Sequence, residues 1–340
     1  MIMASALERH LRACTKEYKD LCAAQGRHVE IDLPGLFDRS YALNLQQPGL
    51  HSANGSCRMI RASDAWIAVN LPRSSDIWTV PAWIGCELDA DPWVAIAEAA
   101  RTRSAADLVA QAQILGIPVA RVGEIIAETA DAALSRRGEA RTVSKPLGKV
   151  IDFTSMWAGP LCGALLATAG AEVIKVEARA RPDAARDASL PFYNALNGQK
   201  KHVTIDLTAE ADLAWLDDQV ATADVFLTSA RPRAFAQLGF DPNRLFAANP
   251  SLTWAAISGY GWLSDLADRV AFGDDAAAAG GLVHWKSDQE PHFFGDASAD
   301  PLTGIAAALG VLRSISMGGG ILVDAAMARV AAGVAALAAA

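Results

Sequence analysis

Hydrophobic positions follow two different patterns along this chain, and the pattern changes near residue 145. From Leu147 onward, short apolar runs typical of buried strands alternate with segments of helical spacing. "KVIDFT" predicts a strand, "GPLCGALLATAG" a helix opened by Pro160 and stopped by Gly170, and "AEVIKVE" a second strand. The alternation continues through the strands "KHVTIDL", "ADVFLTS" and "LTWAAISGYG", with helices predicted over 209–221 and 234–238. This order predicts an α/β fold with an open, mostly parallel sheet flanked by helices.

The part of the chain before residue 145 predicts a smaller α+β unit. "ALERHLRACTKEYKDLCAAQG" is an amphipathic helix pattern that ends at Gly26. "RMIRASDAWIAVNL" predicts a hairpin with its turn at Ser63 and Asp64. "DPWVAIAEAARTRSAADLVAQAQILGIPV" predicts two helices, the second capped by Ser104 and closed by Gly116. We therefore expect a helix and linker over 1–49, a small α+β domain over 50–130, a linker over 131–146 and a large α/β domain over 147–340.

Composition narrows the class of protein. Hydrophobic residues make up 52% of the 340 residues and charged residues 20%, enough apolar material for a sizeable core. The formal net charge of -8 argues against nucleic-acid and membrane-surface partners. Five scattered cysteines without C-x-x-C spacing favour a reducing cytoplasm and argue against a zinc site, so no metal is expected. The alanine-rich tail is interrupted by Arg329, and we expect a core-facing helix there rather than a membrane span.

The loop after the first strand of the predicted parallel sheet excludes several ligand classes. Its sequence is "SMWAGP", not G-x-G-x-x-G, so a nicotinamide dinucleotide is not expected. The chain also lacks the G-x-x-x-x-G-K-[ST] phosphate loop and the G-x-S-x-G motif, which argues against ATP-driven and serine-hydrolase chemistry. We interpret the glycine-rich run "MGGGILVD" as a turn followed by a strand.

Five blocks of sequence resemble the large domain of the class III CoA-transferase family, which includes formyl-CoA and carnitine CoA-transferases and alpha-methylacyl-CoA racemase. In chain order they are "VIDFTSMWAGPLCGALLATAGAEVIKVE", "NGQKKHVTIDL", "ADVFLTSARPRAFAQLGF", "NPSLTWAAISGYG" and "ADPLTGIAAALGVL". The resemblance covers roughly residues 147–327. It implies a Rossmann-like large domain, an acyl-CoA and a carboxylic acid as substrates, and an interlocked homodimer.

The smaller unit resembles the family as well, in "SDAWIAVNL" and "LGIPVARV". In the family the small domain follows the large one, whereas here it precedes it. The order is that of a circular permutation, or of one segment of a longer arrangement with repeated halves. Permutation is tolerated when chain ends lie at the surface, so the departure need not destroy a site.

Asp300, in "ASADPLTGIAAALGVL", has a structural and a chemical interpretation that are compatible. As a helix cap it would precede Pro301 at the first helical position, and the helix end would keep its carboxylate ionised. In the family, D-x-x-[TS]-G before this helix carries the catalytic aspartate, and Asp300 to Gly304 match it. The resemblance therefore implies that Asp300 attacks an acyl-CoA thioester, giving an anhydride and then an aspartyl-CoA thioester. The nearby Asp296 is not favoured, because it lies four residues too far from the helix.

Other family positions imply contacts with CoA. They fall at Met156, Trp157, Ala158, Arg179, Ile205, Ser229 and Ala230. Trp157 taken alone would more often be a core or interface aromatic residue. Basic side chains that could meet the CoA phosphates are Arg179, Arg181, Lys200, Lys201, Arg231 and Arg233.

Alternatives to a CoA-transferase stay open. A racemase of this family needs a histidine in a G-H-D segment, where this chain has Phe272 or Gly273, and no histidine occurs between residues 203 and 283. A racemase is therefore disfavoured. A lyase or another isomerase is harder to exclude, because Asp274 or Asp275 could act as a second acid or base. A non-catalytic CoA-binding subunit is disfavoured by the intact D-x-x-T-G motif. No local motif fixes the acyl group or its acceptor.

Overall fold

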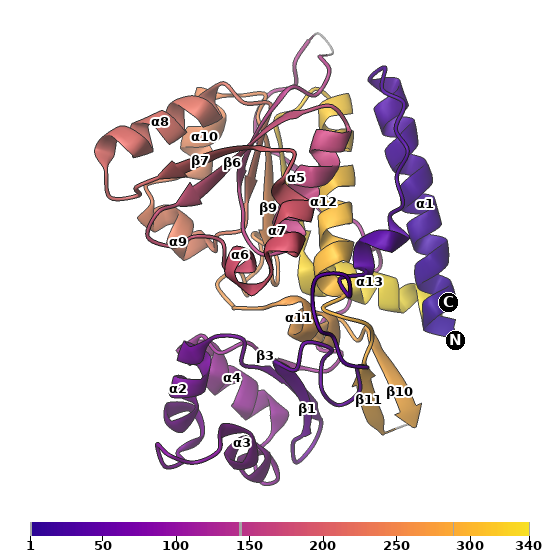
Figure 1. The fold of residues 1–340 in the computed structure, drawn as a ribbon, viewed down its shortest axis with the longest axis vertical. Coiled ribbons are helices and arrows are strands. Elements are labelled where there is room, and N and C mark those ends of the chain that lie inside the picture. The colour runs from indigo at the N-terminus through magenta and orange to yellow at the C-terminus, as the bar shows by residue number, and fades with distance from the viewer. Residues whose placement is uncertain (1, 143–144, 288, 340) are drawn as a thin grey trace.

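A seven-stranded sheet forms the centre of the larger part of the molecule (Figure 1). The structure is a computed structural model, and it describes residues 2–142, 145–287 and 289–339. The strand order is β4-β12-β9-β8-β5-β6-β7, and every neighbouring pair is parallel except β4 and β12 at one edge. The strands are β4 (Ala133–Arg136), β5 (Lys149–Phe153), β6 (Glu172–Ala178), β7 (Lys201–Ile205), β8 (Val225–Thr228), β9 (Thr253–Ser258) and β12 (Ile321–Ala326). The predicted α/β class with a mostly parallel sheet is confirmed.

Helices cover both faces of this sheet. Consecutive residues of a strand point to opposite faces, so each strand contributes side chains to two cores. Val150 faces the core built with a first set of helices, whereas Ile151 faces the core built with a second set. The first set comprises α1 (Ile2–Ala24), α5 (Ala158–Thr168), α6 (Ala184–Ala188), α7 (Leu190–Asn197), α12 (Ala299–Ser316) and α13 (Met327–Ala339). The second comprises α8 (Glu210–Ala221), α9 (Pro232–Gln237) and α10 (Pro242–Ala248).

Most elements predicted from the alternating pattern are present, with one difference at α5. This helix begins at Ala158, so Pro160 is its third residue and not its first as predicted. A proline is tolerated there because the N–H groups of the first helical turn have no partner within the helix. The run "MGGGILVD" is a turn and a strand as predicted, and Gly318, Gly319 and Gly320 all have positive φ. A side chain at Gly319 would also lie 2.1 Å from the Ser251 carbonyl oxygen.

The smaller part of the molecule is an antiparallel sheet of three strands covered by three helices. Its strands are β1 (Cys57–Arg61), β2 (Trp66–Asn70) and β3 (Val119–Arg121), in that order. Its helices are α2 (Ser74–Ile84), α3 (Pro92–Ala100) and α4 (Ala105–Leu115). The predicted hairpin and the last two helices are confirmed, including the Ser104 cap and the Gly116 stop at φ 70°. The sequence did not predict α2, because Pro81 interrupts its helical pattern.

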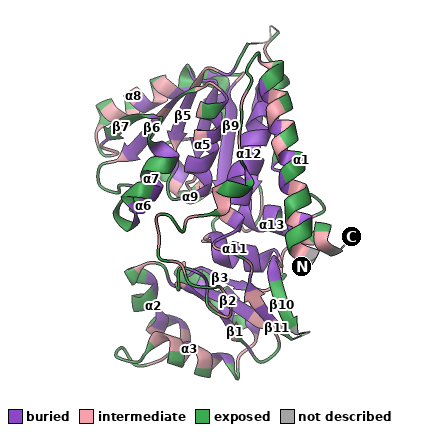
Figure 2. Ribbon diagram, turned by 45° about the vertical axis from the view of Figure 1, so that its right-hand side comes forward, coloured by how far each residue is buried: buried purple, intermediate pink, exposed green. Residues whose placement is uncertain are grey.

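A short helix, α11 (Gly273–Ala279), lies between the two parts (Figure 2). One face of the small sheet packs on α2, α3 and α4, while the other packs on the end of α11 and on the hairpin β10 (Val283–Ser287) and β11 (Glu290–Phe293). All residues of α11 are buried. The same helix contacts α12 and α13 of the larger part. It therefore connects the small sheet to the larger part of the molecule.

The C-terminal helix α13 turns one face to the core, as predicted, through Ala328, Val330, Ala331 and Val334. The N-terminal helix α1 packs against it and against α12. A short 3₁₀ turn, η1 (Pro34–Phe37), lies between α1 and the small sheet in the chain. Within the described ranges, no helix is long and apolar enough to span a membrane.

Candidate active site

Asp300 is the second residue of α12, not its cap as the sequence analysis predicted. The helix begins at Ala299, with Ser298 in the capping position and Pro301 as the third helical residue. The chain enters the helix early because Ala297 adopts φ 42° and its carbonyl accepts the N–H of Asp300 at 2.9 Å. The Asp300 carboxylate is therefore free of a capping role.

Two glycines bring neighbouring helices unusually close to Asp300. Gly304, one turn further along α12, packs on α5 so closely that a side chain there would lie 2.8 Å from the Ala158 carbonyl oxygen. Gly273, the first residue of α11, would place a side chain 2.3 Å from the Asp300 carboxylate. The spacing D-x-x-T-G thus has a physical meaning, since its aspartate and glycine lie on one helical face and the glycine seats that face against α5. The backbone N–H of Ala158 lies close enough to the Asp300 carboxylate to lower its pKa.

Four carboxylates gather around the start of α12. Burial raises the pKa of Asp300 to about 7; the charge of Arg39 lowers it, and the charges of Asp274 and Asp296 raise it. Burial also raises the pKa of Asp274 to about 6 and that of Asp275 to about 7. Burial thus opposes the helix end and the nearby backbone N–H groups, which we expected to keep Asp300 ionised. Around neutral pH, Asp300 exchanges between its acid and its carboxylate.

The strand β2 and the loop before β1 anchor the two carboxylates of α11. Asn70, on β2, donates to Asp275 at 2.8 Å, and Asn54 donates to Asp274 at 3.1 Å. The other oxygen of Asp274 accepts the backbone N–H of Ala297 at 2.9 Å. Asp274 therefore links the small sheet to the loop that leads into Asp300.

Arg39 also reaches this loop, and the sequence analysis missed it. Its guanidinium makes two hydrogen bonds to Asp296, of 2.7 and 2.8 Å, and lies 4.0 Å above the centroid of the Trp157 ring. The two side chains of the ion pair are 11% and 8% exposed. Arg39 lies in an irregular stretch with no periodic pattern, 257 positions before its partner, so no local signal in the sequence could identify it.

The predicted CoA-contact positions lie at the carboxyl edge of the parallel sheet. They occupy the ends of four adjacent strands, β5, β6, β7 and β8, and the loops that follow: Met156, Trp157, Ala158, Arg179, Ile205, Ser229 and Ala230. Two contacts join them across strands. The Ser155 N–H donates to the Ser229 hydroxyl at 3.2 Å, and the Arg179 N–H donates to the Ile205 carbonyl at 2.8 Å.

The side chains at these positions differ in how far solvent reaches them. Met156 is 39% exposed, and Arg179 is exposed as well, whereas Trp157 and Ile205 are each 2% exposed. Trp157 packs edge-on against Phe192, with 5.5 Å between ring centroids. Solvent therefore reaches Met156 at this edge, whereas Trp157 is packed in the core beside it.

A buried ion pair holds the β5–α5 loop in an unusual conformation. Met156 has φ 73°, a region that residues other than glycine rarely adopt. Its N–H donates to Asp183 at 3.0 Å, and Asp183 pairs with the fully buried Lys175 at 3.1 Å. Lys175 also donates to the carbonyl of Thr154. The pair thus fixes both ends of the turn over which the predicted CoA positions lie.

The basic residues suggested for the CoA phosphates are not equivalent in the structure. Lys200 is buried and donates to Asp152 at 2.7 Å, so the suggestion that it meets a phosphate is wrong. Lys201 pairs with Glu172 on the surface, and Arg231 donates to the Asp268 carbonyl. Arg179, Arg181 and Arg233 are exposed.

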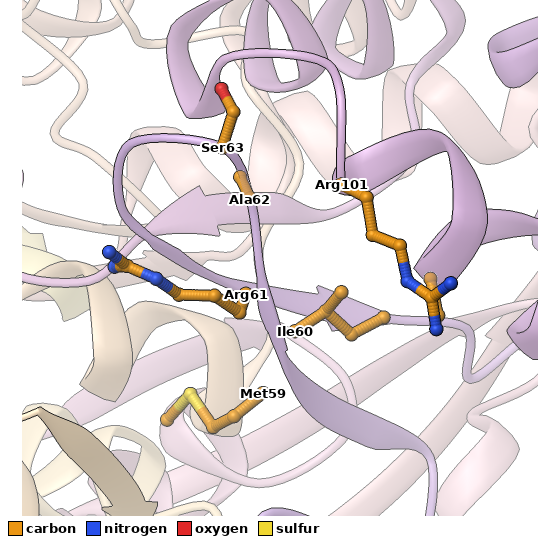
Figure 3. A pocket seen from close by; sticks show the side chains of 7 residues that line it. Met59, Ile60, Arg61, Ala62, Ser63 and Arg101 are labelled. Atoms are coloured by element: carbon orange, nitrogen blue, oxygen red, sulfur yellow. The ribbon is translucent and has the colours of Figure 1, made fainter.

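Two cavities accompany this arrangement. One, of about 270 Å³, lies between residues 31–41 and helices α5 and α7, and Arg39 and Trp157 form part of its wall. The other, of about 500 Å³, lies on the small unit between the end of β1 and α3 (Figure 3). In Figure 3 the side chains of Arg61 and Arg101 point away from each other, so they do not converge on one ligand.

Within the described part of the chain, no three His, Cys, Asp or Glu residues are grouped as a metal site requires.

The fold and the site together define an α/β protein with a partly buried acidic cluster beside the first loop of an open parallel sheet. Comparison with known proteins gives the family: residues 147–340 match the model of CoA-transferase family III. The chain belongs to this family, and the resemblance stated from the sequence is confirmed.

Relatives of known or assigned activity match about half of the chain. Succinyl-CoA–D-citramalate CoA-transferase of Chloroflexus aurantiacus is 33% identical over 176 residues, 49% of this chain and 44% of that protein. A probable fatty acyl-CoA transferase of Mycobacterium tuberculosis is 37% identical over 150 residues, 41% of this chain and 38% of that protein. This chain thus spans less than half the length of these two relatives. A crystal structure of a hypothetical protein of M. tuberculosis matches with a TM-score of 0.51 and 34% identity, over 56% of this chain and 57% of that one.

Proposed function

We propose that this protein moves CoA from an acyl-CoA thioester to a carboxylic acid, with Asp300 as the nucleophile. The observation that carries the proposal is the position of Asp300: a carboxylate with a pKa of about 7, beside the Ala158 N–H and facing the β5–α5 loop of a family III chain. A group that titrates near neutral pH is partly ionised there and can attack a thioester.

The proposed reaction has four steps. A carboxylate oxygen of Asp300 attacks the thioester carbon, the C–S bond breaks, and a mixed anhydride and CoA thiolate result. The thiolate attacks the Asp300 carbonyl carbon, which releases the donor acid and leaves an aspartyl-CoA thioester. An acceptor carboxylate attacks this thioester and again displaces the thiolate. The thiolate then attacks the acceptor carbonyl, giving the new acyl-CoA and restoring the Asp300 carboxylate.

The surroundings of Asp300 support each step. The Ala158 N–H can stabilise negative charge that develops on the attacked carbonyl groups. Partial burial limits the access of water, which would otherwise hydrolyse an anhydride. The predicted CoA positions at the carboxyl edge include the exposed Met156, in the same loop as Ala158, so CoA bound there would bring its thioester toward Asp300.

Covalent trapping tests this proposal. The protein is incubated with a panel of acyl-CoA thioesters, with and without hydroxylamine, and its peptides are analysed by mass spectrometry. We expect an adduct, or a hydroxamate, confined to the Asp300 peptide and formed with a subset of thioesters. Asp300→Asn should abolish the adduct and lower CoA transfer on the order of 10³-fold or more. Asp218→Asn, at an exposed position of α8, is the matched control and should behave as wild type.

A second candidate function is proton transfer at the carbon next to the thioester. Asp274 and Asp275 favour it, because both have raised pKa values and Asp274 lies beside Asp300. Uptake of solvent deuterium at that carbon without a carboxylate acceptor, together with an unmodified Asp300 peptide, would replace the transferase by an isomerase or lyase.

The proposal also includes the organisation of the molecule. We propose an interlocked homodimer in the cytoplasm. We also propose that the small domain precedes the large one, with boundaries near residues 50, 130 and 147. Light scattering of the purified chain measures its oligomeric state, and a monomer that transfers CoA at full rate would remove the dimer from the proposal.

A further inference from the structure

Arg39 belongs to the part of the chain that the family model does not match, yet its guanidinium lies at the candidate active site. The matched segment covers residues 147–340, and Arg39 follows the short turn η1. Its two hydrogen bonds to Asp296 use Nε and Nη2, one to each carboxylate oxygen. Such a two-pronged contact fixes both side chains in one relative orientation. The loop that carries Asp296 is thereby attached to the N-terminal segment, four residues before Asp300.

The guanidinium of Arg39 is also held by two aromatic rings. Its central carbon lies 4.0 Å from the centroid of Trp157 and 5.0 Å from that of Phe192. Trp157 directly precedes Ala158, whose N–H lies near Asp300 and lowers the pKa of its carboxyl group. Arg39 therefore contacts both segments that border Asp300, the loop before α12 and the start of α5.

Most of the charged groups near Asp300 are carboxylates, so a nearby positive charge affects its ionisation strongly. The loop before α12 contributes Asp296, and α11 contributes Asp274, with Asp275 beside it. The start of α5 contributes the uncharged Ala158 N–H. The loop before β1 and the strand β2 contribute the neutral amides of Asn54 and Asn70. Arg39 supplies the positive charge from the N-terminal segment. Without it, Asp300 would face carboxylates in a setting that already disfavours its charge.

We propose that Arg39 is a positioning residue for the reaction of Asp300: its guanidinium fixes the loop before α12 and supplies the positive charge that keeps Asp300 available as a carboxylate. This inference rests on the proposed function, but it makes a separate claim about the acid–base behaviour of Asp300. An arginine is suited to the role because it stays charged at any pH at which the protein is folded.

The test uses two substitutions with opposite expected effects. Arg39→Gln removes the positive charge, so the midpoint of Asp300 ionisation should move up by about one pH unit. Asp296→Asn removes a negative charge, so the same midpoint should move down. Arg39→Lys keeps the charge but loses the two-pronged contact, so the midpoint should stay near that of wild type while kcat falls. A merely structural ion pair would give loss of stability in all three variants and no shift of opposite sign.

Two readouts are needed. Infrared spectroscopy follows the protonated carboxyl band across pH without any substrate, and the Asp300→Asn spectrum identifies the Asp300 contribution. The pH dependence of CoA transfer is measured in parallel, where Arg39→Gln should lose about fivefold in kcat/KM at pH 7 and recover most of it near pH 9. Arg313→Gln is the matched control, because Arg313 makes a similar two-pronged contact with Glu17 at the far end of α12. Its midpoint should equal that of wild type.

The outcomes separate the inference from the proposed function. Shifts of opposite sign in Arg39→Gln and Asp296→Asn support the inference, even if no thioester is ever transferred. Active transfer with the Asp300 midpoint unchanged in both variants overturns it. Should Arg39→Gln fail to fold, Asp296→Asn and Arg39→Lys still decide, because an unshifted midpoint in Asp296→Asn contradicts the electrostatic claim.

Discussion

Substitution of Gly273 by alanine tests whether the close approach of α11 sets the position of Asp300. An added Cβ would lie 2.3 Å from the Asp300 carboxylate and 2.5 Å from the Ala297 carbonyl oxygen, against 3.4 to 4 Å in ordinary contact. The carboxylate can rotate, but the Ala297 carbonyl belongs to the backbone, so the loop before α12 must move by about 1 Å. Gly273 does not have positive φ, and alanine therefore introduces no backbone strain of its own.

The expected losses differ for stability and for activity. Overpacking destabilises by about 1 to 3 kcal/mol, and replacing a helical glycine returns about 0.5 to 1 kcal/mol. The free energy of unfolding should thus fall by about 2.5 kcal/mol at most, a few degrees in melting temperature. A displacement of about 1 Å at a reacting group lowers catalysis on the order of 10²-fold. Activity should therefore suffer far more than stability.

Gly280→Ala is the matched control at the other end of α11. A Cβ there would lie 2.5 Å from the Ala332 nitrogen and 2.6 Å from the Ala328 oxygen, so α13 would be crowded instead of Asp300. Both variants are compared by thermal unfolding and by kcat/KM for CoA transfer. We expect similar melting temperatures but a selective loss of transfer in Gly273→Ala. Equal kcat/KM in the two variants would refute the claim that α11 positions Asp300.

Two further predictions concern stability. Asp274, Asp275 and Asp300 have pKa values raised from 3.8 to about 6, 7 and 7, so the folded chain binds protons more tightly than the unfolded chain. Their contribution is complete below about pH 4 and is lost as pH rises through 6 to 7, so urea unfolding should show higher stability at pH 5.5 than at pH 8, and Asp275→Asn should flatten this slope. A wild-type curve that is flat between these pH values would contradict the raised pKa values. Lys175→Met should lower the free energy of unfolding by about 3 to 5 kcal/mol because it leaves Asp183 buried and unpaired, whereas Lys201→Met, in a surface pair, should change it little. In urea titrations the double variant Lys175→Met/Asp183→Asn should lose less than the sum of the single variants, and strict additivity would show that the pair does not interact.

The sequence predicted the parallel sheet well because each strand from β5 to β9 is a short apolar run between helices, and that pattern is local. The sequence did not correctly predict the first residue of a helix where a local rule allows more than one starting position. At both α5 and α12 a proline suggested the first helical position, yet Pro160 and Pro301 are third residues. The backbone N–H groups of the first helical turn have no partner within the helix, so a proline is tolerated at any of these positions. A proline alone therefore does not determine at which residue the helix begins. The element α2 was missed for a related reason, since Pro81 occurs within a helix.

The site itself was only partly predictable, because its parts come from distant positions. The motif D-x-x-T-G identified Asp300, and the structure adds why the glycine is needed four residues later, against α5. The partners of Asp300 gave no such signal. Arg39 is an isolated arginine in an irregular stretch, and its pairing with Asp296 depends on how α1 and the following turn fold back over α5 and α7.

The contacts that join the smaller part to the larger part bear on the proposed permuted order of the two parts in the chain. Asn54 meets Asp274, Asn70 meets Asp275, and the Val119 carbonyl accepts a hydrogen bond from Arg269 at 2.6 Å. Each contact is made through space by side chains of folded elements, and none depends on which part comes first along the chain. The loop before Asp300 is held at Ala297 by Asp274 and at Asp296 by Arg39, that is, from the small sheet on one side and from the N-terminal segment on the other. Both attachments are made through space, so the proposed permuted order is compatible with the position of Asp300.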